Sequence, residues 1–276
     1  NVIVHAQIEI AVIIAAVPAI GFDHHHRSRL FATPIAAYGI ARVDVWYPGA
    51  ELWDYNVFPG FGRGYEAYSG SALAQDVMAA LEQAVVDGMD VVNLSLQGRV
   101  VRATDFLALA VNSAVDAGVV VAVAAGNTGP DPMTIGVPGN VPYIITVGAM
   151  TDNYTPRDRS DDRIASFSAS GPTIEGFVKP DVVAPGGHVS ALMPGYSQIA
   201  QVHPEFQRDG DYFSMSGTSQ ATAVVSGVVA LMLEADPSLT PDDVKCRMMA
   251  SARPALTTDG DLAAIWERVP TGVCRE

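Results

Sequence analysis

Basic residues are scarce in this sequence. Lysine and arginine together number 16, against 30 aspartates and glutamates, which gives a formal net charge of −14 at pH 7. A nucleic-acid partner requires a basic surface, so this balance argues against nucleic-acid binding. The acidity favours solubility, and it fits a secreted, periplasmic or cell-surface protein.

Cysteine is scarce as well, since Cys246 and Cys274 are the only two. Two cysteines set no disulfide framework, and no spacing of cysteine, histidine or glutamate predicts a built metal site. The two residues could pair and fix the C-terminal end of the chain. Two unpaired thiols, with Cys246 on a helix, are the alternative that the sequence leaves open.

Long apolar runs of the kind that cross a membrane are missing. The apolar stretch at residues 8–21 is too short and contains Pro18. The segment after Ser219 approaches spanning length, but it carries Thr222 and Ser226, so we expect a buried core helix and no membrane span. No basic leader precedes an apolar stretch, and no internal repeat is present.

The middle of the chain alternates short apolar runs with amphipathic segments. Apolar residues recur at helical spacing in two segments, 71–87 and 106–118. Runs of apolar or β-branched residues predict strands in four segments, 49–58, 89–96, 119–127 and 143–150. Continuous apolar strands between such helices indicate a doubly wound α/β fold, in which a mainly parallel sheet carries helices on both faces. Ligands of such sheets bind beyond the carboxyl ends of the strands.

Ser219 lies where an apolar helical segment begins, within the stretch SMSGTSQATAVVSG at residues 214–227. A serine at a helix start is ordinarily a cap. Here the helix is apolar nearly all round, so its N-terminus and its partly positive N–H groups lie at a fixed, partly shielded point. With the small neighbours Gly217, Ala221 and Ala223, this hydroxyl is a candidate nucleophile whose own N–H helps to hold an oxyanion.

Asn127 follows the predicted strand at residues 119–127, in the turn Gly126-Asn127-Thr128-Gly129. Asparagine in a glycine turn is usually only a turn former. A side-chain amide that projects from a strand edge is also a good donor to an oxyanion, so Asn127 is a second candidate.

Several segments, taken in order, resemble the subtilisin-like serine proteases, or subtilases. GTSQATAVVSG (217–227) is similar to their nucleophile motif, AAGNTGP (124–130) to their oxyanion-asparagine turn, and DVVNLSLQG (90–98) to their substrate-binding strand. Further matching segments are IASFSASGP (164–172), KPDVVAPGG (179–187) and TPDDVK (240–245). The resemblance covers roughly residues 48–255 and implies a subtilisin-like three-layer fold.

The resemblance implies a serine endopeptidase that works through an acyl-enzyme intermediate. Ser219 would be the nucleophile, and the Asn127 side chain and the Ser219 N–H would form the oxyanion hole. Polypeptides are the implied substrates, with a propeptide or inhibitor as a further candidate partner. The chemistry would require no cofactor. Structural calcium is a further expectation, with Asn140, nearby carbonyls and Asp152 as candidate ligands.

The resemblance also implies a specificity pocket for the residue before the scissile bond. Ser95 would bind the main chain of the substrate by adding it as a strand. The pocket walls would be Leu96, Gln97 and Gly98 on one side, and Ala124, Ala125 and Gly126 on the other. Because we expect these walls to be small and apolar, we expect the pocket to accept medium to large apolar side chains.

The aspartate and histidine motifs of the subtilases are missing from the N-terminal part. In one interpretation, residues 8–17 are the aspartate strand, with a turn at 14–16, and the base comes from the histidines at 24–26, of which we take His24. In the other, residues 10–16 form the helix after the catalytic histidine, and His5 lies about one residue off register. The histidine cluster could also be a solvated loop or a weak metal patch.

A serine hydroxyl without a base is a poor nucleophile, since loss of the histidine costs about 10⁶ in turnover in a subtilisin and loss of the aspartate about 10⁴. We expect a single catalytic domain over residues 1–276, in which 1–47 are atypical or incomplete and 255–276 form a tail. The competing hypothesis is a catalytically inactive subtilase fold that binds peptides or serves in assembly. An imidazole within about 3 Å of the Ser219 hydroxyl would separate the two.

Overall fold

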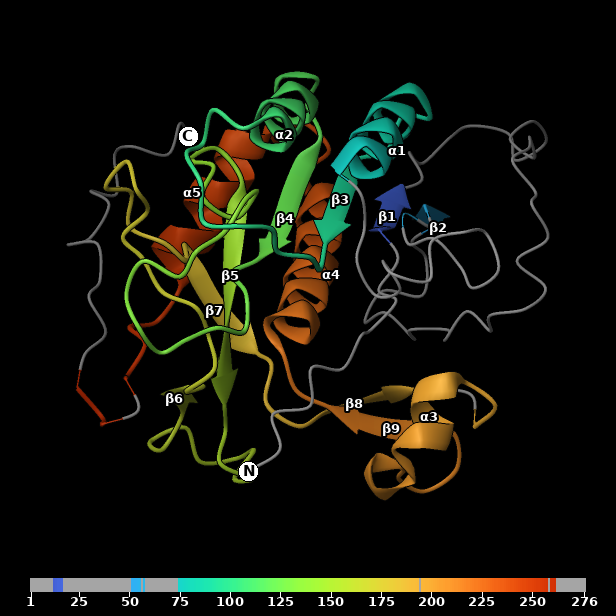
Figure 1. Cartoon of the computed structure of the whole chain (residues 1–276), viewed down its shortest axis with the longest axis vertical. Coiled ribbons are helices and arrows are strands. Elements are labelled where there is room, and N and C mark those ends of the chain that lie inside the picture. Colours follow the sequence, from blue (N-terminus) through green and yellow to red (C-terminus); the bar gives the residue numbers. More distant parts are fainter. Residues whose placement is uncertain are drawn as a thin grey trace.

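The computed structural model describes residues 12–16, 51–55, 57, 74–193, 195–257 and 259–261. They form a seven-stranded sheet covered by helices, together with a two-stranded sheet that projects from one end (Figure 1). The strands are β1 (Val12–Ala16), β2 (Glu51–Tyr55), β3 (Val91–Leu94), β4 (Val120–Ala124), β5 (Ile145–Thr151), β6 (Arg163–Ile164), β7 (Val182–Pro185), β8 (Val189–Leu192) and β9 (Tyr212–Met215).

The centre of the large sheet is parallel, as the sequence predicts. The strand order is β2-β1-β3-β4-β5-β6, and β7 also pairs with β5. The pairs β3–β4, β4–β5 and β5–β7 are parallel, whereas β1, β2 and β6 join antiparallel. Every residue of β3 and β4 is buried, as expected for strands that helices cover on both faces. The predicted doubly wound α/β class is therefore confirmed.

The helices are α1 (Ala74–Val86), α2 (Phe106–Asp116), α3 (Gln198–Val202), α4 (Thr218–Ala235) and α5 (Pro241–Ser251). A 3-10 turn, η2 (Pro204–Phe206), follows α3. Local chemistry fixes where helices begin: the Asp105 carboxylate accepts from the N–H of Leu107 at the start of α2, and Thr240 and Asp243 cap α5 reciprocally.

Alternation along the central strands divides the core between two faces. Val92 of β3 packs with α1 and α2, which lie side by side in Figure 1, whereas its neighbour Val91 packs with α4 and α5. α4 is long and apolar enough to cross a membrane by length and composition. It packs against β3, β4, β5 and β7, which is the buried core helix that the sequence predicts.

Around residue 14 the structure confirms the strand of the first interpretation but contradicts its turn, and it contradicts the helix of the second. Residues 12–16 form a strand rather than a helix, and residues 14–16 lie within that strand rather than in a turn. Ala15 pairs with Val91 at the start of β3, and Ile13 pairs with Asn93 nearer its end. Because β1 runs antiparallel to β3, its carboxyl end lies at the opposite edge of the sheet from the carboxyl ends of β3 and β4. His5 and His24 lie outside the described residues.

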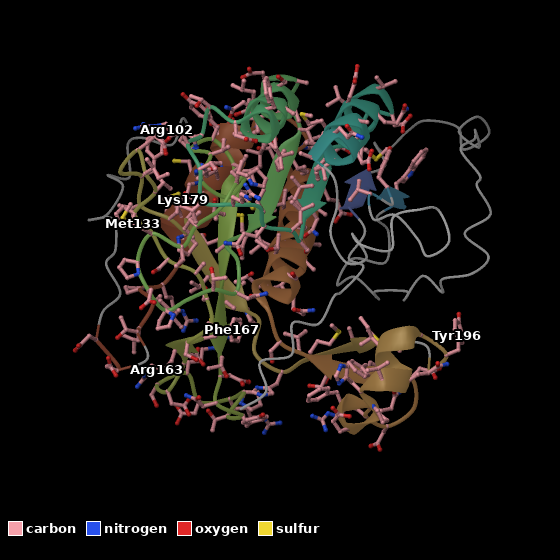
Figure 2. All side chains as sticks on the ribbon, in the orientation of Figure 1. Arg102, Met133, Arg163, Phe167, Lys179 and Tyr196 are labelled. Atoms are coloured by element: carbon pink, nitrogen blue, oxygen red, sulfur yellow. The ribbon has the colours of Figure 1, made fainter. Side chains whose placement is uncertain are left out.

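The hairpin β8–β9, with α3 and η2 between its strands, projects away from the main sheet (Figure 1). Tyr196 lies at its outer end, and its side chain is exposed (Figure 2). On α5, Cys246 is disulfide-bonded, so the interpretation of two unpaired thiols is wrong. Cys274 lies outside the described residues.

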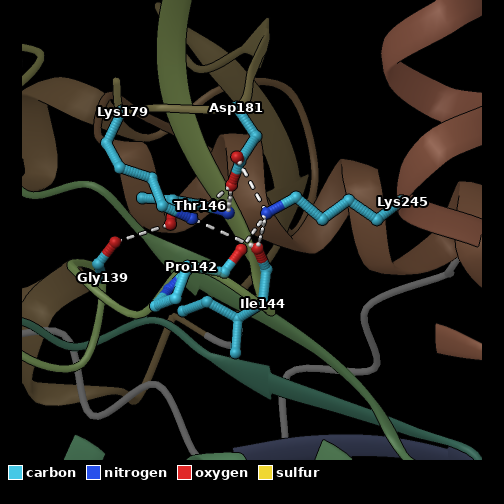
Figure 3. Close-up of polar contacts among 7 residues, drawn as sticks. All are labelled: Gly139, Pro142, Ile144, Thr146, Lys179, Asp181 and Lys245. Carbon is cyan, nitrogen blue, oxygen red and sulfur yellow. Dashed lines mark hydrogen bonds and ion pairs between the residues drawn. The ribbon is translucent and has the colours of Figure 1, made fainter. Parts of the chain in front are cut away.

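Both lysines of the chain meet at one buried carboxylate (Figure 3). The Nζ of Lys179 lies 2.7 Å from Asp181 Oδ2, and the Nζ of Lys245 lies 2.9 Å from Asp181 Oδ1. Lys245 also donates to the carbonyls of Pro142 and Ile144. The cluster thereby ties the chain before β5 and the chain before β7 to α5.

Two lysine ammonium groups contact one carboxylate at this site, and burial has the largest effect on the pKa of Lys179. Its side chain is only 1% exposed. Removal from water lowers the pKa of Lys179 from 10.5 to about 7; the carboxylate of Asp181 opposes this shift, and the charge of Lys245 adds to it.

The pH dependence of stability should reveal this shift. Between pH 7 and about 10 the unfolded chain binds a proton at Lys179 that the folded chain does not. The free-energy cost of burying a charged Lys179 is therefore complete below pH 7 and decreases as the pH rises through this window. We predict that the unfolding free energy of the unsubstituted protein, minus that of Lys179→Met, increases over this window. Denaturant titrations at several pH values would measure the difference.

The matched control is Arg247→Met, which removes an exposed cation from α5. Its unfolding free energy should run parallel to that of the unsubstituted protein. A flat difference for Lys179→Met across the same window would show that the pKa of Lys179 is not lowered.

Candidate active site

The carboxyl end of β4 leads into a tight turn at Gly126. Gly126 has φ of +108°, which side-chain-bearing residues rarely adopt. Its N–H donates to the hydroxyl of Thr218 at 3.1 Å, and its carbonyl accepts from the N–H of Ala169 at 2.9 Å. The turn is therefore held from both sides, and it delivers Asn127 to the surface at the edge of the sheet.

The oxygen of the Asn127 amide is bound by the first residue of α4. Thr218 is fully buried, and both its N–H and its hydroxyl donate to Asn127 Oδ1, at 2.9 and 3.0 Å. Because the oxygen is engaged, the Nδ2 group points the other way, toward Gly217. A Cβ placed on Gly217 would lie 3.5 Å from Asn127 Nδ2 and 3.7 Å from the N of Ser219. Both nitrogens thus lie near Gly217, where Gln220 Oε1 is nearer still, at 2.7 Å from the same Cβ position.

Ser219 follows two residues after Gly217, half-buried at the start of α4. Its hydroxyl donates to the carbonyl of Ser95 at 3.3 Å, and the Ser95 hydroxyl donates to the carbonyl of Ser219 at 3.1 Å. This reciprocal pair joins the start of α4 to the chain just after β3. The expected nucleophile and the expected substrate-binding residue are therefore in direct contact.

A series of hydrogen bonds between buried polar side chains of β3 and α4 supports this pair of serines. Asn93 is fully buried in β3; its Nδ2 donates to the Ser95 hydroxyl at 2.9 Å, and its Oδ1 accepts from Ser226 of α4 at 3.0 Å. Sequence reasoning missed Asn93, Thr218 and Ser226. One polar residue inside the otherwise apolar run of β3 was the available signal, because a buried amide must find partners.

The electrostatics at the start of α4 favour negative charge. The cap residue of α4, Gly217, has no side chain, and the first turn holds no acidic residue, so the acceptor at this helix start is the uncharged Asn127 amide, which binds the Thr218 N–H. The exposed N–H dipoles therefore leave partial positive charge beside the Ser219 hydroxyl. Gln220 adds an unusual feature, because its Oε1 is buried near Gly217 without a hydrogen-bond partner.

The part of the chain that the structure describes holds two histidines, and neither contacts Ser219. The ring of His188 stacks on Tyr154 with centroids 4.4 Å apart, and the ring of His203 lies 3.2 Å from Glu205. The expected base, His24, falls outside the described residues. The described residues thus bring the candidate nucleophile, Ser219, and the candidate oxyanion donor, Asn127, to the start of α4, and their catalytic roles stay a prediction.

The two expected pocket walls lie close together, and Gln97 spans them. The segment that contains Leu96 and Gly98 is anchored by the N–H of Gly98, which donates to the carbonyl of Val137 at 2.6 Å. From this wall the Gln97 amide reaches Gly126 on the other wall, next to Ala124 and Ala125, both of them buried. Gln97 therefore places a polar amide between walls that we expected to be small and apolar, and what the pocket accepts stays a prediction.

The candidate calcium ligands do not converge. Asn140 precedes β5 and Asp152 follows it, so a strand of seven residues, about 20 Å long, separates them. Asn140 donates to the carbonyl of Val101 at 2.7 Å, and Asp152 accepts from the N–H of Tyr154 at 3.1 Å. Within the described ranges, no group of three histidines, cysteines or carboxylates could hold a metal ion.

Comparison with known proteins points to one family. The model of the Subtilase family matches residues 63–266. The chain is 41% identical over 187 residues to the serine protease AprX of Bacillus subtilis, an overlap that spans 64% of this chain and 42% of AprX. It is 32% identical over 207 residues to subtilisin E of the same organism, which spans 74% of this chain and 44% of that protein. The chain therefore spans less than half the length of these relatives.

Solved structures agree with these matches. A psychrophilic protease, S41, superposes with a TM-score of 0.58 at 29% identity, covering 76% of this chain and 63% of its own. The prenylagaramide maturation protease PagA superposes with a TM-score of 0.52 at 26% identity, covering 70% of this chain and 65% of its own.

Replacement of Thr218 by valine tests the contact on which the site is built. The change keeps the shape of the side chain but removes the acceptor of the Gly126 N–H and one donor to Asn127. We expect a loss of about 1–3 kcal/mol in unfolding free energy, since a buried N–H is left without a partner. Denaturant unfolding monitored by circular dichroism would measure it.

The control is Thr222→Val, one turn further along α4. Thr222 is equally buried, but its hydroxyl only adds a second hydrogen bond to the carbonyl of Thr218 within the helix. We expect a clearly smaller loss for this variant. Equal losses would show that the Thr218 hydroxyl has no special role in joining β4 to α4.

Proposed function

Because the chain belongs to the subtilase family, we propose that it is a serine endopeptidase that hydrolyses peptide bonds through an acyl-enzyme intermediate. One observation carries the proposal. The Nδ2 of Asn127 and the backbone N of Ser219 both lie near Gly217, at the start of the helix that carries the Ser219 hydroxyl. That arrangement suits a carbonyl carbon under attack, whose oxygen becomes negative.

In the proposed reaction, the Ser219 oxygen attacks the carbonyl carbon of the scissile peptide bond. The developing oxyanion accepts hydrogen bonds from Asn127 Nδ2 and from the Ser219 N–H, at the positive end of α4. Thr218 already holds the amide of Asn127 in the orientation that presents its nitrogen. The donors need no reorganisation when charge develops, and this preorganisation is what lowers the barrier.

His24 is the proposed general base. It would take the proton of the Ser219 hydroxyl and return it to the amine that leaves. In the structure, that hydroxyl donates to the carbonyl of Ser95 at 3.3 Å, so it must turn away from Ser95 to meet an imidazole.

The substrate is proposed to be a polypeptide that lies along the chain after β3. Ser95 and its neighbours would pair with the substrate main chain as an added strand, while Ala124, Ala125 and Gly126 face the side chain before the scissile bond. The chemistry would need no cofactor. A propeptide, structural calcium and an extracytoplasmic location are proposals that rest on family membership.

Active-site labelling tests the nucleophile. A fluorophosphonate probe should modify Ser219, because its hydroxyl combines a helix N-terminus with two oxyanion donors. Mass spectrometry of the labelled protein should locate the adduct on Ser219. The variant Ser219→Ala should take up no probe, whereas Ser216→Ala, which removes an exposed hydroxyl three residues earlier, should label like the unsubstituted protein. Labelling that persists in Ser219→Ala would refute the assignment.

Removal of the amide tests the oxyanion hole. We expect Asn127→Ala to lower the turnover of a peptide substrate by about 10²–10³, a magnitude taken from a subtilisin that lacks one such amide. KM should change little, because the contact forms mainly in the transition state. A fall of less than about tenfold would place the oxyanion elsewhere.

A further inference from the structure

We propose that the side chain of Gln97 fills the pocket for the residue before the scissile bond, and thereby restricts this enzyme to small side chains at that position. The proposal rests on the proposed function, because it takes the walls of that pocket from it. It concerns substrate selectivity alone, so the measurements that test it, ratios of kcat/KM and of dissociation constants, differ from the probe labelling that tests Ser219.

The geometry places the Gln97 amide between two glycines. A Cβ built on Gly126 would lie 2.0 Å from Gln97 Oε1 and 2.2 Å from its Cδ, so the amide rests directly on the backbone of Gly126. A Cβ built on Gly136 would lie 3.0 Å from Gln97 Cγ. The glutamine amide thus occupies the volume that a side chain at position 126 would fill, and its Cγ lies beside Gly136, next to the carbonyl of Gly98.

A hydrogen bond holds the amide in that place. Gln97 Nε2 donates to the carbonyl of Thr134 at 2.9 Å. Thr134 is itself fixed, because its N–H donates to the carbonyl of Ser170 and its hydroxyl accepts from the N–H of Ser170. To withdraw from the pocket, Gln97 must give up this bond, so a large substrate side chain has to displace a side chain that is anchored.

The position of Gly126 places the Gln97 amide close to the proposed reaction centre. Asn127, the next residue, presents the proposed oxyanion donor, and Gly126 itself bonds to Thr218 at the start of α4. The side chain that precedes the scissile bond must pass close to Gly126, where the Gln97 amide lies. Alanine or serine there needs little room beyond its Cβ, whereas leucine or phenylalanine needs the volume that Gln97 fills.

Peptide hydrolysis by three variants tests the proposal. Internally quenched peptides that differ only in alanine or phenylalanine before the scissile bond would be compared by kcat/KM. The unsubstituted protein should prefer alanine, and Gln97→Ala should shift the ratio toward phenylalanine by about 10–100-fold. Gln97→Leu, which keeps the bulk but loses the amide, should retain the preference for alanine.

The matched control is Gln201→Ala on α3. The amide of Gln201 also donates to a main-chain carbonyl, that of Tyr196 at 3.2 Å, but its side chain is exposed on the projecting hairpin unit. Its kcat/KM ratio should equal that of the unsubstituted protein. A preference for phenylalanine in the unsubstituted protein, or an unchanged ratio in Gln97→Ala, would overturn the proposal.

A binding experiment separates this proposal from the proposed chemistry. In a Ser219→Ala background, calorimetry would give dissociation constants for product peptides that end in alanine or phenylalanine. Adding Gln97→Ala should tighten binding of the phenylalanine peptide about 10–100-fold relative to the alanine peptide. This shift without probe labelling of Ser219 in the unsubstituted protein would uphold the pocket and refute the endopeptidase. Labelling of Ser219 without this shift would support the endopeptidase and refute the role of Gln97 in the pocket. Failure of every variant to bind either peptide would also refute the pocket.

Discussion

The contact between Asn127 and Thr218 holds the candidate site together. Thr218 gives two hydrogen bonds to the oxygen of the Asn127 amide and accepts one from the N–H of Gly126, so the first residue of α4 is bonded to the turn after β4. Because the amide oxygen is taken, only its nitrogen is free to meet a ligand. The fold itself, rather than the arriving substrate, therefore decides which end of the amide faces the Ser219 hydroxyl, and that is the condition for preorganised electrostatic stabilisation.

The buried polar residues of β3 and α4 extend this arrangement into the core. Asn93 has no exposure to solvent, and its side chain supports Ser95 on one side and binds Ser226 on the other. A buried amide with partners at both ends resists displacement, because any shift would leave a donor or acceptor without a partner. The register between β3 and α4 is thus fixed by polar contacts as well as by apolar packing.

The sequence was sufficient for strands β2 to β5, for helices α1, α2 and α4, and for naming Asn127 and Ser219 as candidates, because apolar runs, helical spacing and the stretch around Ser219 are local patterns. It was insufficient wherever the outcome depends on distant partners. The antiparallel direction of β1 follows from pairing with β2 and β3, which lie far along the chain. We expected the side chain of Gln97 only to line a wall of the pocket. Its position across the pocket depends on a hydrogen bond to the carbonyl of Thr134, 37 residues further along the chain, which no local pattern reveals.

The two lysines around Asp181 leave the described surface of the folded protein without a freely accessible lysine amine. Lys179 and Lys245 are the only lysines in the chain, and their side chains are 1% and 14% exposed. Acylating dyes and amine-directed cross-linkers need an uncharged, solvent-accessible nitrogen, so their reaction with these lysines must wait for α5 to separate from the sheet. The rate of lysine modification in this protein would consequently report the rate or extent of local opening, with no engineered reporter required.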